Sequence, residues 1–157
     1  MKDATTQALL HALDRAYDRA SWHGPNLRGA IRGMSHASAA KRPGRGRHSV
    51  WELVVHCAYW KYAVRRRLTG ERRGSFPLEG SNWFRREARD GAERWKADVA
   101  LLDDCHRSLR EAVEALPAGR WGRRAKGRWT YQDLVAGAAA HDLYHAGQAR
   151  LIKVMGR

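Results

Sequence analysis

The sequence predicts an all-α protein that folds as an up-down four-helix bundle. Long segments place apolar residues in steps of three and four, the spacing of one helix face, and two of these segments begin with a helix-capping pattern. Strand-like alternation of apolar and polar residues is absent from the sequence. The length of 157 residues and the hydrophobic share of 43% suit one globular domain over residues 1–157.

The first helix is expected from Ala4 to about Ser21, because its apolar side chains recur at helical spacing. These side chains are Leu9, Leu13, Ala16 and Ala20. Gly24 and Pro25 break this helix. A short helix then resumes through Leu27, Ile31 and Met34.

Capping signals define two of the other helices. An S-x-x-E box at Ser49–Glu52 begins a helix that runs to about Leu68, and Thr130–Asp133 begins one that runs to about Met155. Between them, a helix over about Asp90 to Leu116 carries a regular apolar stripe typical of a bundle. Its members are Trp95, Val99, Leu102, His106, Leu109, Val113 and Leu116.

The positive charge is concentrated in loops and near helix ends. The net charge is +14, and loops rich in Gly, Pro or Arg are expected at 41–48, 69–82 and 117–129. Such an excess is compatible with a solvated surface, an anionic small-molecule partner or nucleic acid. The scattered distribution favours a solvated surface. Because no recognition motif is present, nucleic acid is not an expected partner.

Cysteine usage and hydropathy indicate a cytoplasmic protein. The two cysteines, Cys57 and Cys105, lack the CxxC spacing of a redox or structural zinc site and are expected to be small buried residues. A reactive Cys57, beside His56, is the alternative. No apolar run approaches the roughly 18 residues needed to cross a bilayer, and the N-terminus lacks an apolar signal segment.

Two histidines one turn apart, His141 and His145, lie on the last predicted helix. At about 100° per residue they share a stripe with apolar residues at both ends, so we expect both imidazoles to face the bundle core. The other members of the stripe are Leu134, Ala138, Gln148 and Ile152. The small residues at 137–140 leave room for a neighbouring helix or a ligand.

Buried imidazoles need polar partners, and a metal ion can satisfy two that are spaced i, i+4. Two core histidines bonded to backbone or water are the alternative. A third ligand has to come from another inward-facing residue, and His56 and His106 both qualify. Periodicity does not choose between them. Ligation by histidine alone suits zinc, nickel, iron or copper.

The segments RHSVWELVVHCAYWKYAVRRRLTG and TYQDLVAGAAAHDLYHAGQARLIK resemble the DinB-like (DinB/YfiT) superfamily of metal-dependent four-helix-bundle proteins. The loop FPLEGSNWF and the segment SWHGPNLRGAIRGM extend the likeness over nearly the whole chain. The resemblance implies that His56, His141 and His145 bind a divalent metal such as zinc, nickel or iron. It also implies a homodimer, to which Trp83 and Trp121 are candidates to contribute.

Two classes of function follow from the resemblance. The first is a metal-dependent S-transferase that uses a low-molecular-weight thiol or another anionic small molecule, with hydrolysis as a related reaction. The second is a non-catalytic metal-binding protein or a nucleic-acid or stress-associated binding protein. Further pocket candidates are Glu52, Trp60, His106, Tyr144 and Gln148, with Glu52 also assigned to its capping box. His23 either lines the site or is exposed.

Overall fold

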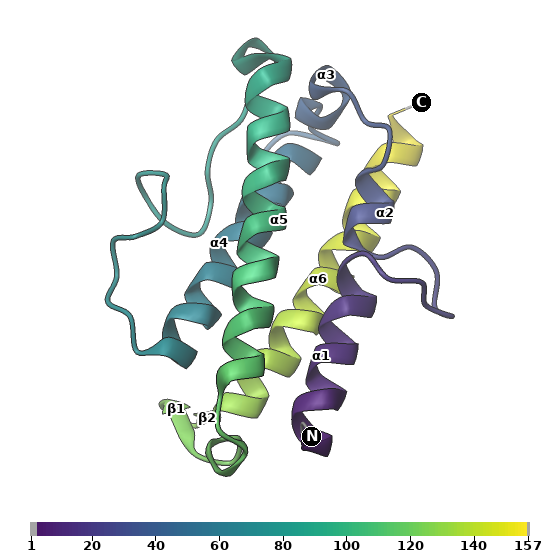
Figure 1. Ribbon diagram of the computed structural model, residues 1–157. Helices are drawn as coiled ribbons and strands as arrows, with labels where there is room; N and C mark the ends of the chain where they lie inside the picture. The colour runs from purple at the N-terminus through teal and green to yellow at the C-terminus, as the bar shows by residue number, and fades with distance from the viewer. Residues whose placement is uncertain (1–2, 157) are drawn as a thin grey trace.

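The computed structural model describes residues 3–156 as a bundle of helices with one small hairpin (Figure 1). The bundle helices are α1 (Ala4–Tyr17), α4 (Val50–Thr69), α5 (Gly91–Ala115) and α6 (Tyr131–Met155). The connections contain the short helices α2 (Leu27–Ile31) and α3 (His36–Ala40), 3-10 turns at Ala88–Asp90 and Ala118–Arg120, and strands β1 (Arg124–Lys126) and β2 (Trp129–Thr130). The predicted all-α four-helix bundle is confirmed.

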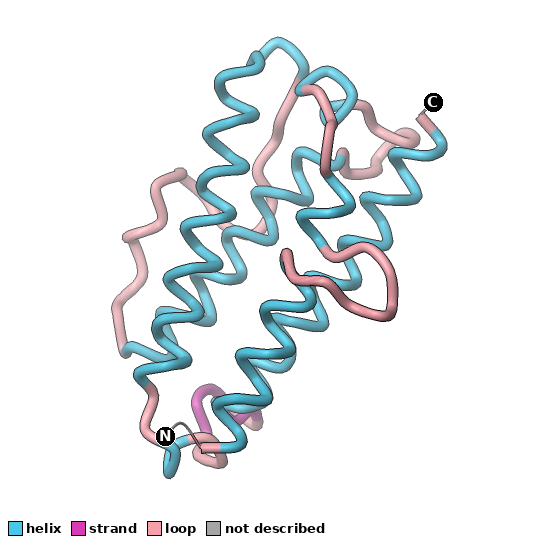
Figure 2. The backbone as a smooth tube through the Cα atoms, turned by 45° about the vertical axis from the view of Figure 1, so that its right-hand side comes forward, coloured by secondary structure: helices cyan, strands magenta, loops and turns pink. Residues whose placement is uncertain are grey.

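Contacts between the helices fix their directions. Trp51 of α4 donates a hydrogen bond to Asp98 of α5, and further along both helices Lys61 lies beside His106. Residue numbers therefore increase in the same direction in α4 and α5, so these two helices are parallel. Figure 1 shows α1 and α6 running the opposite way, which gives the order up, down, down, up in place of the predicted up-down alternation. Parallel neighbours need a long return connection. Residues 70–90 supply it as the extended loop beside the bundle in Figure 2.

The core consists of two hydrophobic clusters separated by a layer of polar side chains. One cluster, near α2 and α3, includes Leu27, Trp51, Val54 and Leu102. The other, toward the hairpin, includes Leu13, Leu109, Val113 and Val135. Between the two clusters along the helices lie Lys61, His106 and Asp142, all buried. We call these three residues the polar layer.

The predicted capping boxes are present. Ser49 accepts from the backbone N–H of Glu52 while the Glu52 carboxylate accepts from the backbone N–H of Ser49, and Thr130 and Asp133 do the same at α6. The first helix is shorter than expected, because it ends at Tyr17 instead of Ser21. Past this point the apolar stripe stops, since Ala20 is exposed and has nothing to bury against.

The loop expected at 117–129 contains an element that the sequence pattern did not predict. Strands β1 and β2 pair antiparallel across a turn with Gly127 at φ 57°, a left-handed conformation that favours glycine. The segment from 27 to 40 also holds two short helices, each with its own side-chain cap from Asn26 or Ser35, where one was expected.

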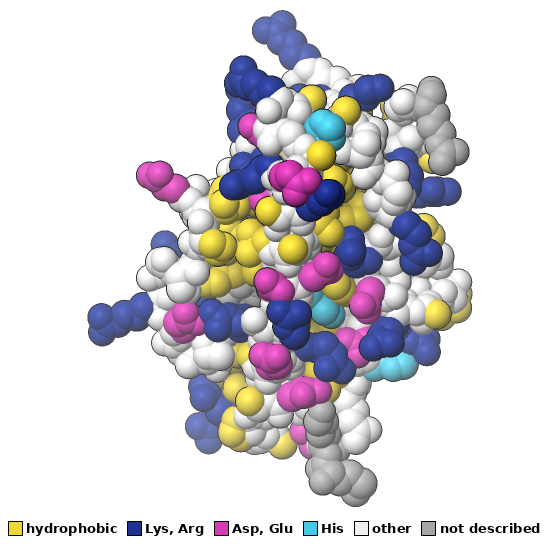
Figure 3. All heavy atoms as spheres, turned by 45° about the horizontal axis from the view of Figure 1, so that its top comes forward, with side chains coloured by type: hydrophobic (Ala, Val, Ile, Leu, Met, Phe, Trp, Pro, Cys, Tyr) yellow, Lys and Arg dark blue, Asp and Glu magenta, His cyan; other side chains and the backbone are white. Residues whose placement is uncertain are grey.

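The surface carries charges of both signs. On the face in Figure 3, Lys and Arg side chains are spread widely, with Asp and Glu between them and apolar side chains near the centre. Over residues 3–156, no helix is both long and apolar enough to cross a membrane.

Candidate metal centre

Three imidazoles from two antiparallel helices converge at one point. The Nε2 atom of His141, on α6, lies 3.1 Å from Nε2 of His56, on α4, and 3.1 Å from Nε2 of His145. His56 and His145 are buried and His141 is partly exposed. Metal–nitrogen bonds of about 2.0–2.1 Å place neighbouring ligand nitrogens about 3.0–3.4 Å apart, so this spacing suits one divalent ion.

Hydrogen bonds at the far side of two rings orient the Nε2 atoms. The carbonyl oxygen of Asn82 lies 2.8 Å from Nδ1 of His56, and Oε1 of Gln148 lies 2.6 Å from Nδ1 of His145. Both oxygens are acceptors, so each Nδ1 carries the proton and each Nε2 presents a lone pair. Metal-binding histidines show the same arrangement, which fixes tautomer and ring orientation.

The three rings are neutral at physiological pH. Burial lowers the pKa of His56 to about 4 and that of His141 to about 3, and the pKa of His145 is lowered for the same reason. Neutral imidazole is the form that binds metals. The Nε2 atoms of His56 and His145 both direct a lone pair at Nε2 of His141. A neutral His141 ring has at most one hydrogen on that nitrogen, so it can donate to only one of them. A divalent cation would satisfy all three nitrogens, so the donor set fits a metal.

A loop after α4 covers this cluster with aromatic and amide groups. The Trp83 ring stacks on His56 with centroids 3.8 Å apart and on His48 with centroids 3.5 Å apart. Asn82 sits in the left-handed region at φ 65°, which Asn tolerates better than most residues. Besides its contact with His56, Asn82 accepts a hydrogen bond from Trp60 Nε1 at 2.9 Å.

The fold and the three-histidine cluster agree with a comparison against protein families. The family model described as the DinB superfamily matches residues 19–149. The chain belongs to the DinB superfamily. Comparisons with curated proteins and with solved structures give no significant match.

His106, the competing third ligand, lies away from the histidine cluster of this DinB-superfamily protein. Its ring stacks on Tyr17 at 3.8 Å, and its Nδ1 lies 3.3 Å from Nζ of Lys61. The three-histidine group within coordination reach contains His56 and not His106. Periodicity had placed both residues on buried helix faces, and only the packing of α4 against α6 separates them.

The structure places the remaining pocket candidates in different surroundings. Glu52 is committed to its cap and to Arg42 and His48, while Gln148 bonds His145 directly. The Tyr144 ring lies 5.0 Å from that of His145, although its side chain is exposed. His23 is exposed.

The predicted inward stripe of α6 needs a correction. Only Ala138 and His145 of its six members are buried, whereas Leu134, His141, Gln148 and Ile152 are partly exposed. The face turned into the core holds Val135, Ala139, Asp142, Ala146 and Ala149. His141 therefore lies at the edge of the core, beside a groove between α4 and α6, and His145 is buried one turn further along α6.

Lys61 and Asp142 of the polar layer, together with Asn82, are site features that the sequence pattern did not single out. Lys61 donates a hydrogen bond to Asp142, and the two side chains are almost fully buried. An Asp inside an apolar helix segment, GAAAHDLYHAG, is the signal that could have indicated a buried partner. Nothing in the sequence distinguishes Asn82 from a surface loop residue.

A second group of possible ligands adjoins the first but fits a metal poorly. Cys57, His141 and Asp142 have candidate atoms within 4.8 Å of one another. The ammonium of Lys61 already bonds Asp142, and burial raises the pKa of the Cys57 thiol. A cation there would have to displace both an ammonium and a thiol proton. The high pKa and complete burial also oppose the alternative of a reactive Cys57.

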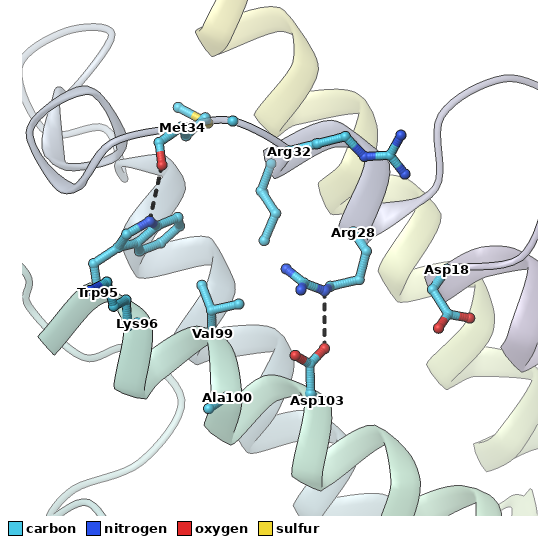
Figure 4. A pocket seen from close by; sticks show the side chains of 11 residues that line it. Asp18, Arg28, Arg32, Met34, Trp95, Lys96, Val99, Ala100 and Asp103 are labelled. Carbon is cyan, nitrogen blue, oxygen red and sulfur yellow. Dashed lines mark hydrogen bonds and ion pairs between the residues drawn. The ribbon is translucent and has the colours of Figure 1, made fainter. Parts of the chain in front are cut away.

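Two cavities lie along α6 on either side of the histidine cluster. One, of about 260 Å³, is lined by His141 and by residues of α6 that precede it. The other, of about 480 Å³, is lined by His145 and by residues that follow it. A larger cavity, of about 580 Å³, is elsewhere, between α2 and α5 (Figure 4). There Arg28 forms an ion pair with Asp103 at 3.0 Å.

The homodimer stays a prediction. Trp121 cannot contribute an exposed surface to it, because this side chain is buried and its Nε1 donates to Thr6 at 3.0 Å. The sequence placed Trp121 in a polar, arginine-rich loop, but the loop folds back onto α1. Trp83 is partly exposed, with its ring stacked between two histidines.

The surroundings of His106 predict a pH dependence of stability. Burial and the positive charges of Lys61 and Arg110 lower the pKa of His106 to about 3, against about 6.5 in an unfolded chain. Between these values the unfolded state binds a proton that the folded state does not. The free energy of unfolding should therefore fall as pH falls through this window, by up to about 1.4 kcal/mol per pH unit.

Urea denaturation of metal-free protein between pH 7 and 4 measures this slope. The His106→Gln variant should lose stability less steeply than the wild type as pH falls. Equal slopes of stability against pH in the two proteins would contradict this prediction. They would show that His106 binds its proton in the folded state as readily as in the unfolded chain.

Proposed function

We propose that the protein is a divalent-metal-dependent enzyme that transfers a low-molecular-weight thiol to an electrophile. The observation that supports this function is the convergence of three Nε2 atoms between two cavities. Three protein ligands leave coordination positions for an exogenous group, whereas a closed structural zinc site takes four. Zinc, nickel and iron all suit this donor set.

A divalent metal held by the three histidines would lower the pKa of a bound thiol, so that thiolate is available at neutral pH. The residues around the site do the remaining work. Asn82 and Gln148 hold two imidazoles with Nε2 directed at the centre. Trp83 covers one face of His56 and limits access of water from that side.

The cavity beside His145 has the polar groups that an anionic thiol needs. We call it the basic pocket; its polar lining consists of Arg47, His48, Tyr144, His145 and Gln148. Arg47 is exposed and can pair with a carboxylate, and His48 lies next to it in sequence. A carboxylate-bearing thiol placed here would direct its sulfur at the histidine cluster.

The proposed reaction is a nucleophilic substitution in which atoms and charge balance. The thiol gives up its proton to solvent, and a lone pair of sulfur forms a bond to the electrophilic carbon. The bond from that carbon to its leaving group breaks, and the leaving group departs with the bonding pair. The products are a thioether, the leaving-group anion and a proton.

Elemental analysis of protein purified without an affinity tag, followed by turnover assays, tests the proposal. We expect close to one divalent ion per chain and thiol-dependent turnover that a chelator abolishes and the ion restores. Glutathione is the first thiol to use, with a panel of electrophiles. Bound metal without turnover across the panel would contradict the enzyme and support a non-catalytic metal-binding protein. Absence of metal would contradict the centre itself.

Turnover should depend on salt when the thiol carries carboxylates. Arg47 attracts an anion to the basic pocket, and salt screens such attraction over about 10 Å at about 0.1 M. The Michaelis constant for glutathione should rise with salt, while that for the neutral thiol mercaptoethanol should change little. Arg47→Gln should raise the constant for glutathione about two- to fivefold at low salt.

Arg45→Gln is the matched control, because Arg45 lies in the same loop and is exposed but does not line the pocket. Arg123 and Arg124, in the arginine-rich loop before α6, also lie outside both cavity linings. If Arg47→Gln and Arg45→Gln change the Michaelis constant for glutathione equally, the positive charge serves solubility alone. Equal salt responses of glutathione and mercaptoethanol would lead to the same conclusion.

A further inference from the structure

The cavity on the His141 side differs in character from the basic pocket. We call it the tryptophan pocket; its apolar walls are formed by Trp60, Val64, Trp129, Leu134, Gly137 and Ala138. Trp129 comes from strand β2 and leaves about half of its surface (48%) exposed. A tryptophan held half-exposed at the wall of a cavity offers apolar contact area to an occupant.

The tryptophan pocket adjoins the histidine cluster directly. His141, whose Nε2 lies closest to both other histidines, is part of its lining. The Trp60 ring lies 6.4 Å from that of His141, and its hydrogen bond to Asn82 fixes the indole. A molecule in this pocket would place a reacting atom beside the cluster, opposite a thiol in the basic pocket.

The charged groups of the pocket restrict its occupant. Lys61 and Asp142 neutralise each other, so they present no net charge. Arg67 and Asp133 also line the pocket with opposite charges, so its lining carries no net charge and favours a neutral occupant. Gly137 contributes open space, because a Cβ placed there would meet no atom within 4 Å.

We propose that the tryptophan pocket binds the electrophilic substrate as a planar aromatic ring with electron-withdrawing substituents. This inference rests on the proposed function for its reaction, but the binding itself does not require turnover. With chlorodinitrobenzene, the thiol sulfur bonds to the ring carbon that bears chlorine. The carbon–chlorine bond breaks, chloride leaves with the bonding pair, and the thiol proton passes to the buffer.

Filling the pocket from Gly137 tests the proposal. A side chain at this helix position leans toward the N-terminal end of α6, away from His141, and Phe is a better helix former than Gly. Gly137→Phe should therefore leave folding and metal content unchanged. It should raise the Michaelis constant for chlorodinitrobenzene about tenfold or more. The constant for the small aliphatic electrophile iodoacetamide should stay the same.

Gly147→Phe is the matched control. Gly147 lies in the same helix, is also exposed with open space around its Cβ position, and lines neither pocket. It should behave like the wild type toward both electrophiles. Equal effects of the two Phe substitutions, or an equal loss for both electrophiles, would overturn the assignment of the aromatic substrate to this pocket.

A binding experiment without thiol separates this inference from the proposed function. Nitrobenzene should quench tryptophan fluorescence with a saturable component in the wild type and in Gly147→Phe, and this component should disappear in Gly137→Phe. Saturable quenching without any turnover would reject the transferase while retaining the pocket. Linear quenching that is identical in all three proteins would reject the pocket even if turnover is observed.

Discussion

Lys61→Met is expected to lower the free energy of unfolding by about 3–5 kcal/mol. Lys61 is 1% exposed, and its ammonium bonds to Asp142, which is fully buried between the two hydrophobic clusters. Within the described residues, Oδ1 of this carboxylate has no hydrogen-bond partner. Removing the ammonium would leave a charged or newly protonated carboxyl group buried without a partner, and either state costs free energy.

Urea denaturation of metal-free protein measures the effect. The double variant Lys61→Met/Asp142→Leu should recover much of the loss, because it buries no unpaired charge. Lys96→Met is the control: Lys96 forms an exposed ion pair with Glu93 at 2.9 Å, and such pairs contribute at most about 1 kcal/mol. A loss below about 1 kcal/mol for Lys61→Met would mean that water reaches the polar layer and solvates Asp142.

The second large effect concerns the metal. Replacement of His56, His141 or His145 with Ala should in each case weaken metal binding by at least about 100-fold. Loss of a residue that only hydrogen-bonds to a metal ligand already weakens binding by about 10–100-fold, and loss of the ligand itself should cost more. His106→Ala should retain the ion, since its ring contacts Lys61 and Tyr17 instead of the cluster.

Equilibrium dialysis followed by elemental analysis gives the stoichiometry in each variant. Trp83 provides an independent signal, because its stack on His56 should make its fluorescence respond to the ion. The His106→Ala protein should show this response and the His56→Ala protein should not. Loss of metal in His106→Ala alone would place the centre in the polar layer.

Local sequence was sufficient to determine the helices that carry the site. The capping boxes at Ser49 and Thr130 fix the starts of α4 and α6, because each is closed by hydrogen bonds within four residues. The i, i+4 spacing likewise brings His141 and His145 to the same side of α6, whatever the helix packs against. Such short-range interactions can be deduced from the order of residues alone.

Tertiary structure decided which groups meet across the bundle. His56 and His141 are 85 positions apart, and both His56 and His106 satisfied the periodicity of a buried face. The choice between them depends on the rotation of α6, which turns Asp142 into the core toward Lys61 and leaves His141 at the groove edge toward His56. Helix rotation is set by the sum of contacts with every neighbouring helix, and no single segment contains that information.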